Sequence, residues 1–192
     1  MNFQYPVCLS LKGKRCLLIG NGYGADEKAH GMEDAGAVVE RRPDYAEGSL
    51  AGFFLVIAAT GDRGLNGRIA AESERRGILF NAVDDPEHCG FILPAIHRQG
   101  DLVVAVSTGG RSPAVAVRLR DWIAREVGPE YELLVEMLGR LRQEVAARFP
   151  DFDERRRLWH RLAGSGALRL LREGRSREAR ELVRDLVEGR AA

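Results

Sequence analysis

A short apolar run that ends in a glycine-rich loop constrains the fold more than any other feature of this sequence. Residues Arg15–Gly20 read RCLLIG, which is typical of a strand buried on both faces of a parallel sheet. The segment after the loop, residues 25–35, has a pattern that predicts a helix ending at Gly36. A strand, a glycine loop and a helix in this order predict the first unit of an α/β domain.

The following residues repeat this alternation. The strongest strand signal is Phe53–Thr60 (FFLVIAAT), and further strands are predicted at residues 37–40, 78–83 and 102–107, with a helix at 66–76. Only residues 41–52 separate the second strand from the third, which leaves little room for a helical crossover of at least about 10–12 residues. The pattern predicts an α/β fold, with a Rossmann-type parallel sheet that carries helices on both faces.

The chain changes character after Pro113. A helix is predicted at Ala114–Glu126, with Ser112 as its cap and Pro113 in its first turn. From Pro129 onward only helical signals occur, at residues 130–148, 153–162, 167–172 and 176–188. We therefore expect a Rossmann-type domain over residues 1–113 and a C-terminal all-helical module over residues 114–192.

Charge and cysteine content narrow the possible partners. The 29 Lys and Arg residues balance 28 Asp and Glu residues, and acidic residues are interspersed through the tail, so we expect no nucleic-acid partner. Three cysteines without CxxC spacing favour a reducing cytosol over a disulfide framework, and no metal site is predicted. We see no signal peptide and no apolar run of about 18–20 residues, and therefore expect a cytoplasmic protein without a membrane span.

The glycine loop has the spacing of a dinucleotide-binding loop. Its residues are Gly20, Asn21, Gly22, Tyr23, Gly24 and Ala25, a G-x-G-x-x-A pattern between a strand and a helix. In such a loop the first glycine allows the turn, the second allows close approach of a pyrophosphate, and the alanine brings the helix close to the strand. The alternative is a strand–helix turn that needs small residues only for packing.

A dinucleotide site also needs a carboxylate near the end of the second strand, to bind the ribose hydroxyls. Glu40 is predicted to hold that position, although it is equally well explained as a surface residue. Arg41 and Arg42 follow it and would suit a 2′-phosphate, so the choice between NAD and NADP stays open. Thr60, at the end of the third strand, is also predicted to bind the cofactor.

Four segments carry a resemblance to a known family. YPVCLSLKGKRCLLIGNG, LVIAAT, NAVDDPEHCGFILPAI and GDLVVAVSTGGRSPAVAVRLR occur in order and resemble the siroheme synthase N-terminal family. That family comprises precorrin-2 dehydrogenases, some of which are also sirohydrochlorin ferrochelatases. The resemblance implies NAD-dependent removal of a hydride and a proton from precorrin-2 to give sirohydrochlorin, with Fe²⁺ as a second substrate in some members. It also implies a homodimer whose tail helices help to form the active-site walls.

The resemblance also implies roles for particular residues. Asp84 matches the proposed acid/base aspartate, just past a strand end; the alternative is that it caps the turn at Asp85-Pro86, a task for which Asp85 is the stronger candidate. A second glycine-rich turn is expected to hold a propionate or acetate arm of the substrate, and comprises Ser107, Thr108, Gly109, Gly110, Arg111 and Ser112. Arg118 and Arg120 could add positive charge to it, and His97 could deliver iron.

Three other functions remain open at this point. The short crossover at residues 41–52 and the acidic helix start at Asp26 leave room for a chelatase that lacks redox chemistry. A non-enzymatic tetrapyrrole-binding protein with a degenerate NAD site is equally consistent with these changes. A Rossmann reductase of another small substrate is the last alternative, because a glycine loop alone does not identify a reaction.

Overall fold

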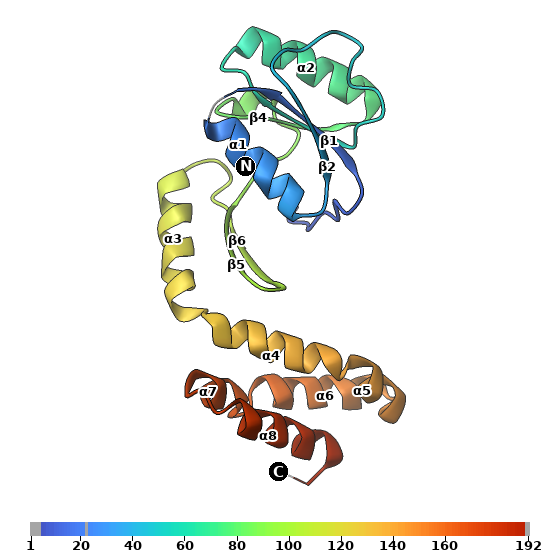
Figure 1. The fold of residues 1–192 in the computed structure, drawn as a ribbon, viewed down its shortest axis with the longest axis vertical. Coiled ribbons are helices and arrows are strands. Elements are labelled where there is room, and N and C mark those ends of the chain that lie inside the picture. Colours follow the sequence, from blue (N-terminus) through green and yellow to red (C-terminus); the bar gives the residue numbers. More distant parts are fainter. Residues whose placement is uncertain (1–4, 22, 191–192) are drawn as a thin grey trace. The chain divides into compact units, whose positions relative to one another are not determined.

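The computed structural model describes residues 5–21 and 23–190, which form two compact units (Figure 1). The first comprises the chain up to Leu93 together with Gly109–Arg111, and the second comprises Pro94–Thr108 and the chain from Ser112 onward. The division therefore differs from the expected boundary at residue 113, because residues 94–108 group with the helices and not with the parallel sheet.

The first unit is built on a parallel sheet of four strands. In space their order is β2 (Val38–Arg42), β1 (Arg15–Gly20), β3 (Leu55–Ala59) and β4 (Leu79–Ala82). Every pair is parallel, and β1 lies between β2 and β3 with Gly20 opposite Ala59. The Rossmann-type parallel sheet predicted from the sequence is confirmed.

Helices α1 (Tyr23–Asp34) and α2 (Arg63–Arg76) cover opposite faces of this sheet (Figure 1). Side chains alternate along each strand, so Cys16 and Leu18 of β1 belong to the α1 face, and Leu17 and Ile19 belong to the α2 face. The core on the α1 side includes Ala25, Ala29 and Met32, and the core on the α2 side includes Ile69, Phe53 and Phe80. Burial on both faces explains why the strands read as nearly continuous apolar runs.

The crossover from β2 to β3 contains no helix, as its length suggests, and a buried carboxylate of α2 holds it in place. Glu72 is 1% exposed and accepts hydrogen bonds from Tyr45 Oη (2.5 Å), Gly48 N (2.9 Å) and Leu50 N (3.3 Å). Arg76 Nε donates a fourth at 2.7 Å. These bonds satisfy backbone N–H groups that a helix would otherwise have paired.

One predicted strand of the parallel sheet belongs elsewhere. β6 (Leu102–Val106) pairs antiparallel with β5 (Ala95–Gln99) as a separate two-stranded ribbon in the second unit, so its expected place in the parallel sheet was wrong. Gln99 lies opposite Leu102, which leaves only Gly100 and Asp101 as the connection. Two residues suffice for a hairpin, with Gly100 at φ 56°, whereas a parallel pair needs a long crossover.

The remainder of the second unit is helical. Its helices are α3 (Pro113–Glu126), α4 (Pro129–Arg140), α5 (Arg142–Arg148), α6 (Phe152–Ala163), α7 (Ala167–Arg172) and α8 (Ser176–Glu188). The single helix expected over residues 130–148 is in fact α4 and α5, divided at Leu141. The capping role expected of Ser112 is also wrong, because its side chain makes no bond to the first turn of α3.

Helices α4 to α8 share one apolar core, which accounts for the leucine spacing of the tail. Its fully buried side chains include Val145, Leu158, Leu162 and Val183. By contrast, α3 and the ribbon β5–β6 keep much apolar surface exposed, at Ile96, Val103, Val115, Val117, Leu119 and Trp122. None of the helices in the described part of the chain is long and apolar enough to cross a membrane.

Candidate functional site

The glycine loop begins at the carboxyl end of β1, where Gly20 is required by its surroundings. Gly20 has a φ of 107°, and a Cβ atom on it would lie 2.2 Å from the carbonyl oxygen of Ala59 in β3. Both facts exclude other residues there, because L-amino acids avoid this backbone region and the β3 carbonyl leaves no space. The structure thus accounts for Gly20 through strand packing as well as through the predicted turn. Gly22 lies outside the described residues.

The start of α1 is open at Gly24. Asn21 is exposed, Gly24 has open space where a Cβ would stand, and Ala25 is 2% exposed against the sheet. The first-turn amides of a 12-residue helix that begins at Tyr23 lack helical partners and suit an anion. Arg41 balances the acidic start, since its guanidinium lies 2.8 Å from Asp26.

Glu40 has partners other than a ribose in this structure. It lies opposite Leu17 in the middle of β1, two residues before the carboxyl end of β2. Its carboxylate accepts hydrogen bonds from Arg42 Nε (2.7 Å) and Arg15 (3.4 Å), and chiefly the bond from Arg42 lowers the pKa of Glu40. Both guanidinium groups stack on Phe53. Ribose binding by Glu40 therefore stays a prediction, and it would require this ion cluster to rearrange.

A polar network occupies the carboxyl ends of β3 and β4. Thr60 Oγ1 donates to Asn66 Oδ1 (2.7 Å), and Asn66 Nδ2 donates to Asp85 Oδ2 (3.1 Å). His88 Nδ1 donates to the same oxygen of Asp85 at 2.7 Å. Asp85 is 3% exposed, and the bond from His88, more than any other contact, lowers the pKa of its carboxyl. Thr60, predicted as a cofactor ligand, here uses its hydroxyl within the protein.

Asp84 and Asp85 are adjacent but have opposite environments. Asp84 is exposed and has a φ of 58°, a positive value that no other non-glycine residue takes within residues 5–21 and 23–190. The side chain of Asp85 points into the protein and makes no cap bond to the 3-10 helix η1 (Pro86–His88). The expectation that Asp85 caps this turn with its side chain is therefore wrong. The i,i+3 spacing of Asp85 and His88 could have revealed their pairing in the sequence.

The second glycine-rich turn contains two adjacent glycines with positive φ. Gly109 and Gly110 have φ values of 63° and 76°, and both are exposed. Thr108 Oγ1 accepts a hydrogen bond from Ser112 N at 3.1 Å, directly before α3 begins at Pro113. Ser107 has interactions within the protein, Arg111 is exposed, and Gly109–Arg111 group with the first unit.

Two of the three other residues considered for the substrate site have partners within the protein. Arg120 forms an ion pair with Asp121, and Arg118 is exposed on α3. His97 lies on β5, where its Nε2 atom donates to the carbonyl oxygen of Val127 at 2.8 Å. This bond ties the ribbon to the end of α3, and iron delivery by His97 stays a prediction. No cluster of ligands suited to a metal ion occurs in the described part of the chain.

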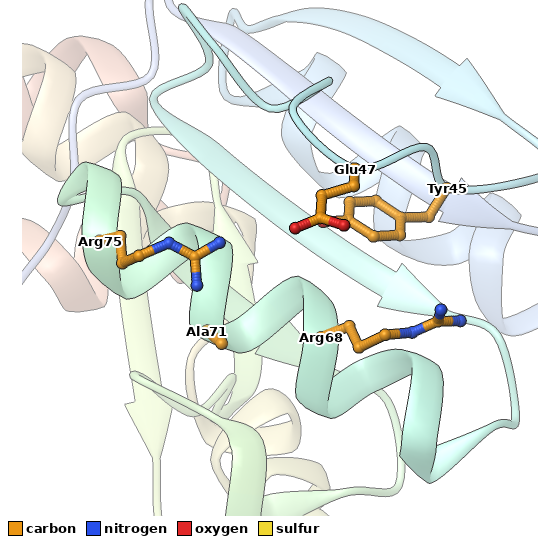
Figure 2. A pocket seen from close by; sticks show the side chains of 5 residues that line it. All are labelled: Tyr45, Glu47, Arg68, Ala71 and Arg75. Atoms are coloured by element: carbon orange, nitrogen blue, oxygen red, sulfur yellow. The ribbon is translucent and has the colours of Figure 1, made fainter.

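A cavity of about 180 Å³ lies between α2 and the β2–β3 crossover. Figure 2 shows that Tyr45 and Glu47 of the β2–β3 crossover and Arg68, Ala71 and Arg75 of α2 form its walls. It contains neither the glycine loop nor Asp84, so it is separate from the site predicted from the sequence.

Comparisons with protein families match three consecutive segments of the chain. Residues 38–95 match a family described as putative NAD(P)-binding, and residues 99–126 match the sirohaem biosynthesis protein central region. Residues 130–187 match the sirohaem synthase dimerisation region. The border between the first two matches lies close to the boundary between the compact units at residue 93.

Curated proteins and solved structures agree with these matches. The chain is 34% identical over 201 residues to siroheme synthase of Edwardsiella ictaluri, covering 93% of this chain and 44% of that protein. It is 38% identical over 176 residues to siroheme synthase of Chromobacterium violaceum, covering 81% and 37%. The chain therefore spans less than half the length of these relatives.

A solved structure of SirC, precorrin-2 dehydrogenase, has a TM-score of 0.74 to this chain at 20% identity, covering 95% of this chain and all of the other. This likeness shows that the two proteins share a fold. The three family matches and the curated relatives show, in addition, that residues 38–187 are similar to the siroheme synthase N-terminal family.

Proposed function

We propose that this protein is an NAD-dependent precorrin-2 dehydrogenase that produces sirohydrochlorin. The observation that carries the proposal is the placement of Asp84 at the carboxyl edge of the parallel sheet, the edge at which the glycine loop also begins. Open α/β sheets bind ligands at this edge. The names of the relatives, siroheme synthase and precorrin-2 dehydrogenase, support this choice of substrate.

The reaction needs one hydride acceptor and one proton acceptor. Bound NAD⁺ supplies the hydride acceptor. Asp84 is exposed, and its carboxylate is available to take the proton that leaves the macrocycle. The first-turn amides of α1, with Gly24 open beside them, would hold the pyrophosphate of NAD. Asn21, Gly22, Tyr23 and Ala25 would complete this loop as predicted.

The substrate carries carboxylate arms, and the turn Ser107–Ser112 is the proposed anchor for one of them. Gly110 is exposed with a φ of 76°, and a glycine-rich turn that leads into a helix is a common site for an anion. Arg111 is exposed beside them and would add a positive charge. Thr108 holds the turn closed through its bond to Ser112 N.

We propose that the protein acts as a homodimer in the cytoplasm. The match of residues 130–187 to a dimerisation region supports the dimer, and the exposed apolar face of α3, which precedes that region, is our proposed addition to the contact surface. Val115, Leu119 and Trp122 lie at helical spacing on α3 with about half of each side chain exposed, which is unusual for an isolated chain. The three free cysteines, Cys8, Cys16 and Cys89, fit a reducing compartment.

The test is turnover of precorrin-2 with NAD⁺ by wild type, Asp84→Asn and Gly24→Asp. We expect sirohydrochlorin from wild type, a loss of kcat of about 10²-fold or more in Asp84→Asn with unchanged NAD⁺ binding, and loss of NAD⁺ binding in Gly24→Asp. Asparagine tolerates positive φ, so Asp84→Asn preserves the backbone. Absence of turnover by wild type would refute the proposed reaction.

A second candidate, a chelatase without redox chemistry, is favoured by the environment of Glu40. Its carboxylate is already held by Arg42 and Arg15, and the β2–β3 crossover has no helix to widen the adenosine side of a cofactor site. In that case Fe²⁺ would be a substrate, and Asp84 would accept a pyrrole proton. Metal uptake by sirohydrochlorin in the absence of NAD⁺, with no NAD⁺ binding by calorimetry, would select this candidate. Sirohydrochlorin binding with neither reaction would instead indicate a carrier protein.

A further inference from the structure

The buried carboxylate of Asp85 is the strongest feature that the proposed reaction leaves unexplained. Its side chain is 2% exposed, and Oδ2 accepts hydrogen bonds from Asn66 and His88. Oδ1 accepts none from the described part of the chain, and Arg63 Nε lies 3.6 Å away from it. An aspartate is seldom fully buried unless its carboxylate is paired, because burial of an unpaired charge is costly. We therefore expect Asp85 to have a role in the fold or in the functional site.

The partners of Asp85 come from two different elements. Asn66 belongs to the first turns of α2, and Thr60 donates to the amide oxygen of Asn66. His88 ends η1, and its ring lies against α2, where a Cβ added to Gly67 would be 3.1 Å from Nε2. Asp85 therefore fastens the segment after β4 to the start of α2.

The backbone on each side of Asp84 is also tied to the sheet. Val83 N donates to Ala58 O (2.8 Å) in β3, and Asp85 N donates to Ala82 O (3.3 Å). Between these two bonds, Asp84 adopts its positive φ of 58°. Such a conformation persists only when the surrounding structure enforces it, and functional sites are where it is most often found.

We propose that Asp85 is a positioning residue, whose bonds to Asn66 and His88 hold the turn so that the adjacent Asp84 stands outward at the carboxyl edge of the sheet. This inference rests on the proposed function, in which Asp84 accepts the proton. Asp85 itself is buried and does not touch the substrate. These bonds would hold the carboxylate of Asp84 within reach of the proton that it accepts. A small displacement of a catalytic group can lower the rate of a reaction by a large factor.

The first experiment measures the turn directly and does not depend on activity. Hydrogen exchange, followed by mass spectrometry on the full chain, compares wild type with Asp85→Asn, His88→Ala and the control Glu87→Gln. We expect peptides that cover residues 83–90 to exchange about tenfold faster in Asp85→Asn and less markedly in His88→Ala, with β1 unchanged. Glu87 is an exposed neighbouring carboxylate whose ion pair with Arg63 is open to solvent on both sides, so its substitution should leave exchange close to wild type. Wild-type exchange in both Asp85→Asn and His88→Ala would overturn the proposal.

The second experiment is a double-mutant cycle with Asp84. If Asp85 acts through Asp84, Asp85→Asn should lower kcat for precorrin-2 about tenfold, with KM and the NAD⁺ dissociation constant within about twofold of wild type. In an Asp84→Asn background the same substitution should cause no further loss. An equal, additive loss in that background would show an independent structural role and would overturn the proposal.

The two experiments separate this inference from the proposed reaction. If wild type does not turn over precorrin-2, the proposed reaction is wrong, while hydrogen exchange still decides whether Asp85 holds the turn. If Asp85→Asn does not fold, His88→Ala carries both tests, because it removes one of the two bonds and leaves the carboxylate and Asn66 in place.

Discussion

Replacing Glu72 should destabilise the first unit, because this residue of α2 holds the β2–β3 crossover in place. This carboxylate is the shared acceptor for Tyr45, two backbone N–H groups of the β2–β3 crossover, and Arg76. With Glu72→Ala, Leu50 N is left buried without an acceptor and the crossover loses its attachment to α2. We expect this segment to detach before the sheet itself unfolds.

The structure sets the size of the effect. Water can replace the bond to Arg76, which is 39% exposed, and in part the bonds to Tyr45 and Gly48, but Leu50 N is buried. Leaving a buried N–H without an acceptor costs about 1–3 kcal/mol and a bond to a charged group contributes about 1.5–3 kcal/mol, so Glu72→Ala should lower the free energy of unfolding by about 3–4 kcal/mol. Glu72→Gln keeps the shape and one acceptor oxygen, and should cost about 2 kcal/mol.

The contribution of Glu72 should also depend on pH. Burial alone would raise the pKa of Glu72, but the hydrogen bonds from Tyr45, Gly48, Leu50 and Arg76 together lower it below the ordinary 4.5. Because the folded pKa is the lower one, the stabilisation is complete above about pH 4.5 and is lost as the pH falls through the folded value. The difference between wild type and Glu72→Gln should therefore shrink below pH 4.5.

The assay must observe the first unit separately. Trp122 and Trp159 both belong to the second unit, so tryptophan fluorescence follows that unit and serves as an internal reference. Hydrogen exchange of peptides covering residues 45–50 reports on the crossover. Glu74→Ala, an exposed carboxylate two residues along the same helix, is the matched control and should change stability by less than about 0.5 kcal/mol. A loss below about 1 kcal/mol in Glu72→Ala would refute this reasoning.

Further outcomes follow from other contacts. Gly20→Ala should prevent folding of the first unit, whereas Gly24→Ala should fold normally but bind NAD⁺ more weakly. Circular dichroism measures the folding and calorimetry measures the binding. Equal stability of the two variants would contradict the argument that Gly20 packs against β3. Burial, followed by the bond to Glu72, raises the pKa of Tyr45 to about 12, so its stabilisation should be complete below pH 10 and lost between about 10 and 12. Ultraviolet titration should show a late tyrosine that is absent in Tyr45→Phe. Trp122→Glu should shift the protein from dimer to monomer in analytical ultracentrifugation, and an unchanged dimer would exclude this face.

Local patterns in the sequence were sufficient for the parallel sheet and for most helices. The runs CLLI and LVIAA are apolar at every position, and they lie in strands buried on both faces. Helices α7 and α8 begin and end at the predicted residues, since Gly166 and Gly189 mark their limits. These signals depend on neighbouring residues alone, which is why the sequence reveals them.

The errors arose where distant residues decide the structure. LVVAV reads as a strand, but its partner is set by the two-residue turn at Gly100, and the preceding AIHRQ was too polar to be recognised as that partner. The role of Asp85 depends on Asn66, nineteen residues earlier in the chain. Spacing between Asp85 and His88 hints at a pair, but only the folded chain shows that the pair is buried.

Because the ribbon β5–β6 groups with the helices, the two units are difficult to prepare as separate fragments. Within the described chain, the backbone passes between the units at residues 93–94, 108–109 and 111–112, so no single cut separates them. A fragment that stops at residue 113 would retain the ribbon but lose α3 and the carbonyl of Val127, to which His97 is bonded. Such a fragment should be prone to self-association through the unpaired edges of the ribbon β5–β6, and its behaviour would say little about the intact molecule.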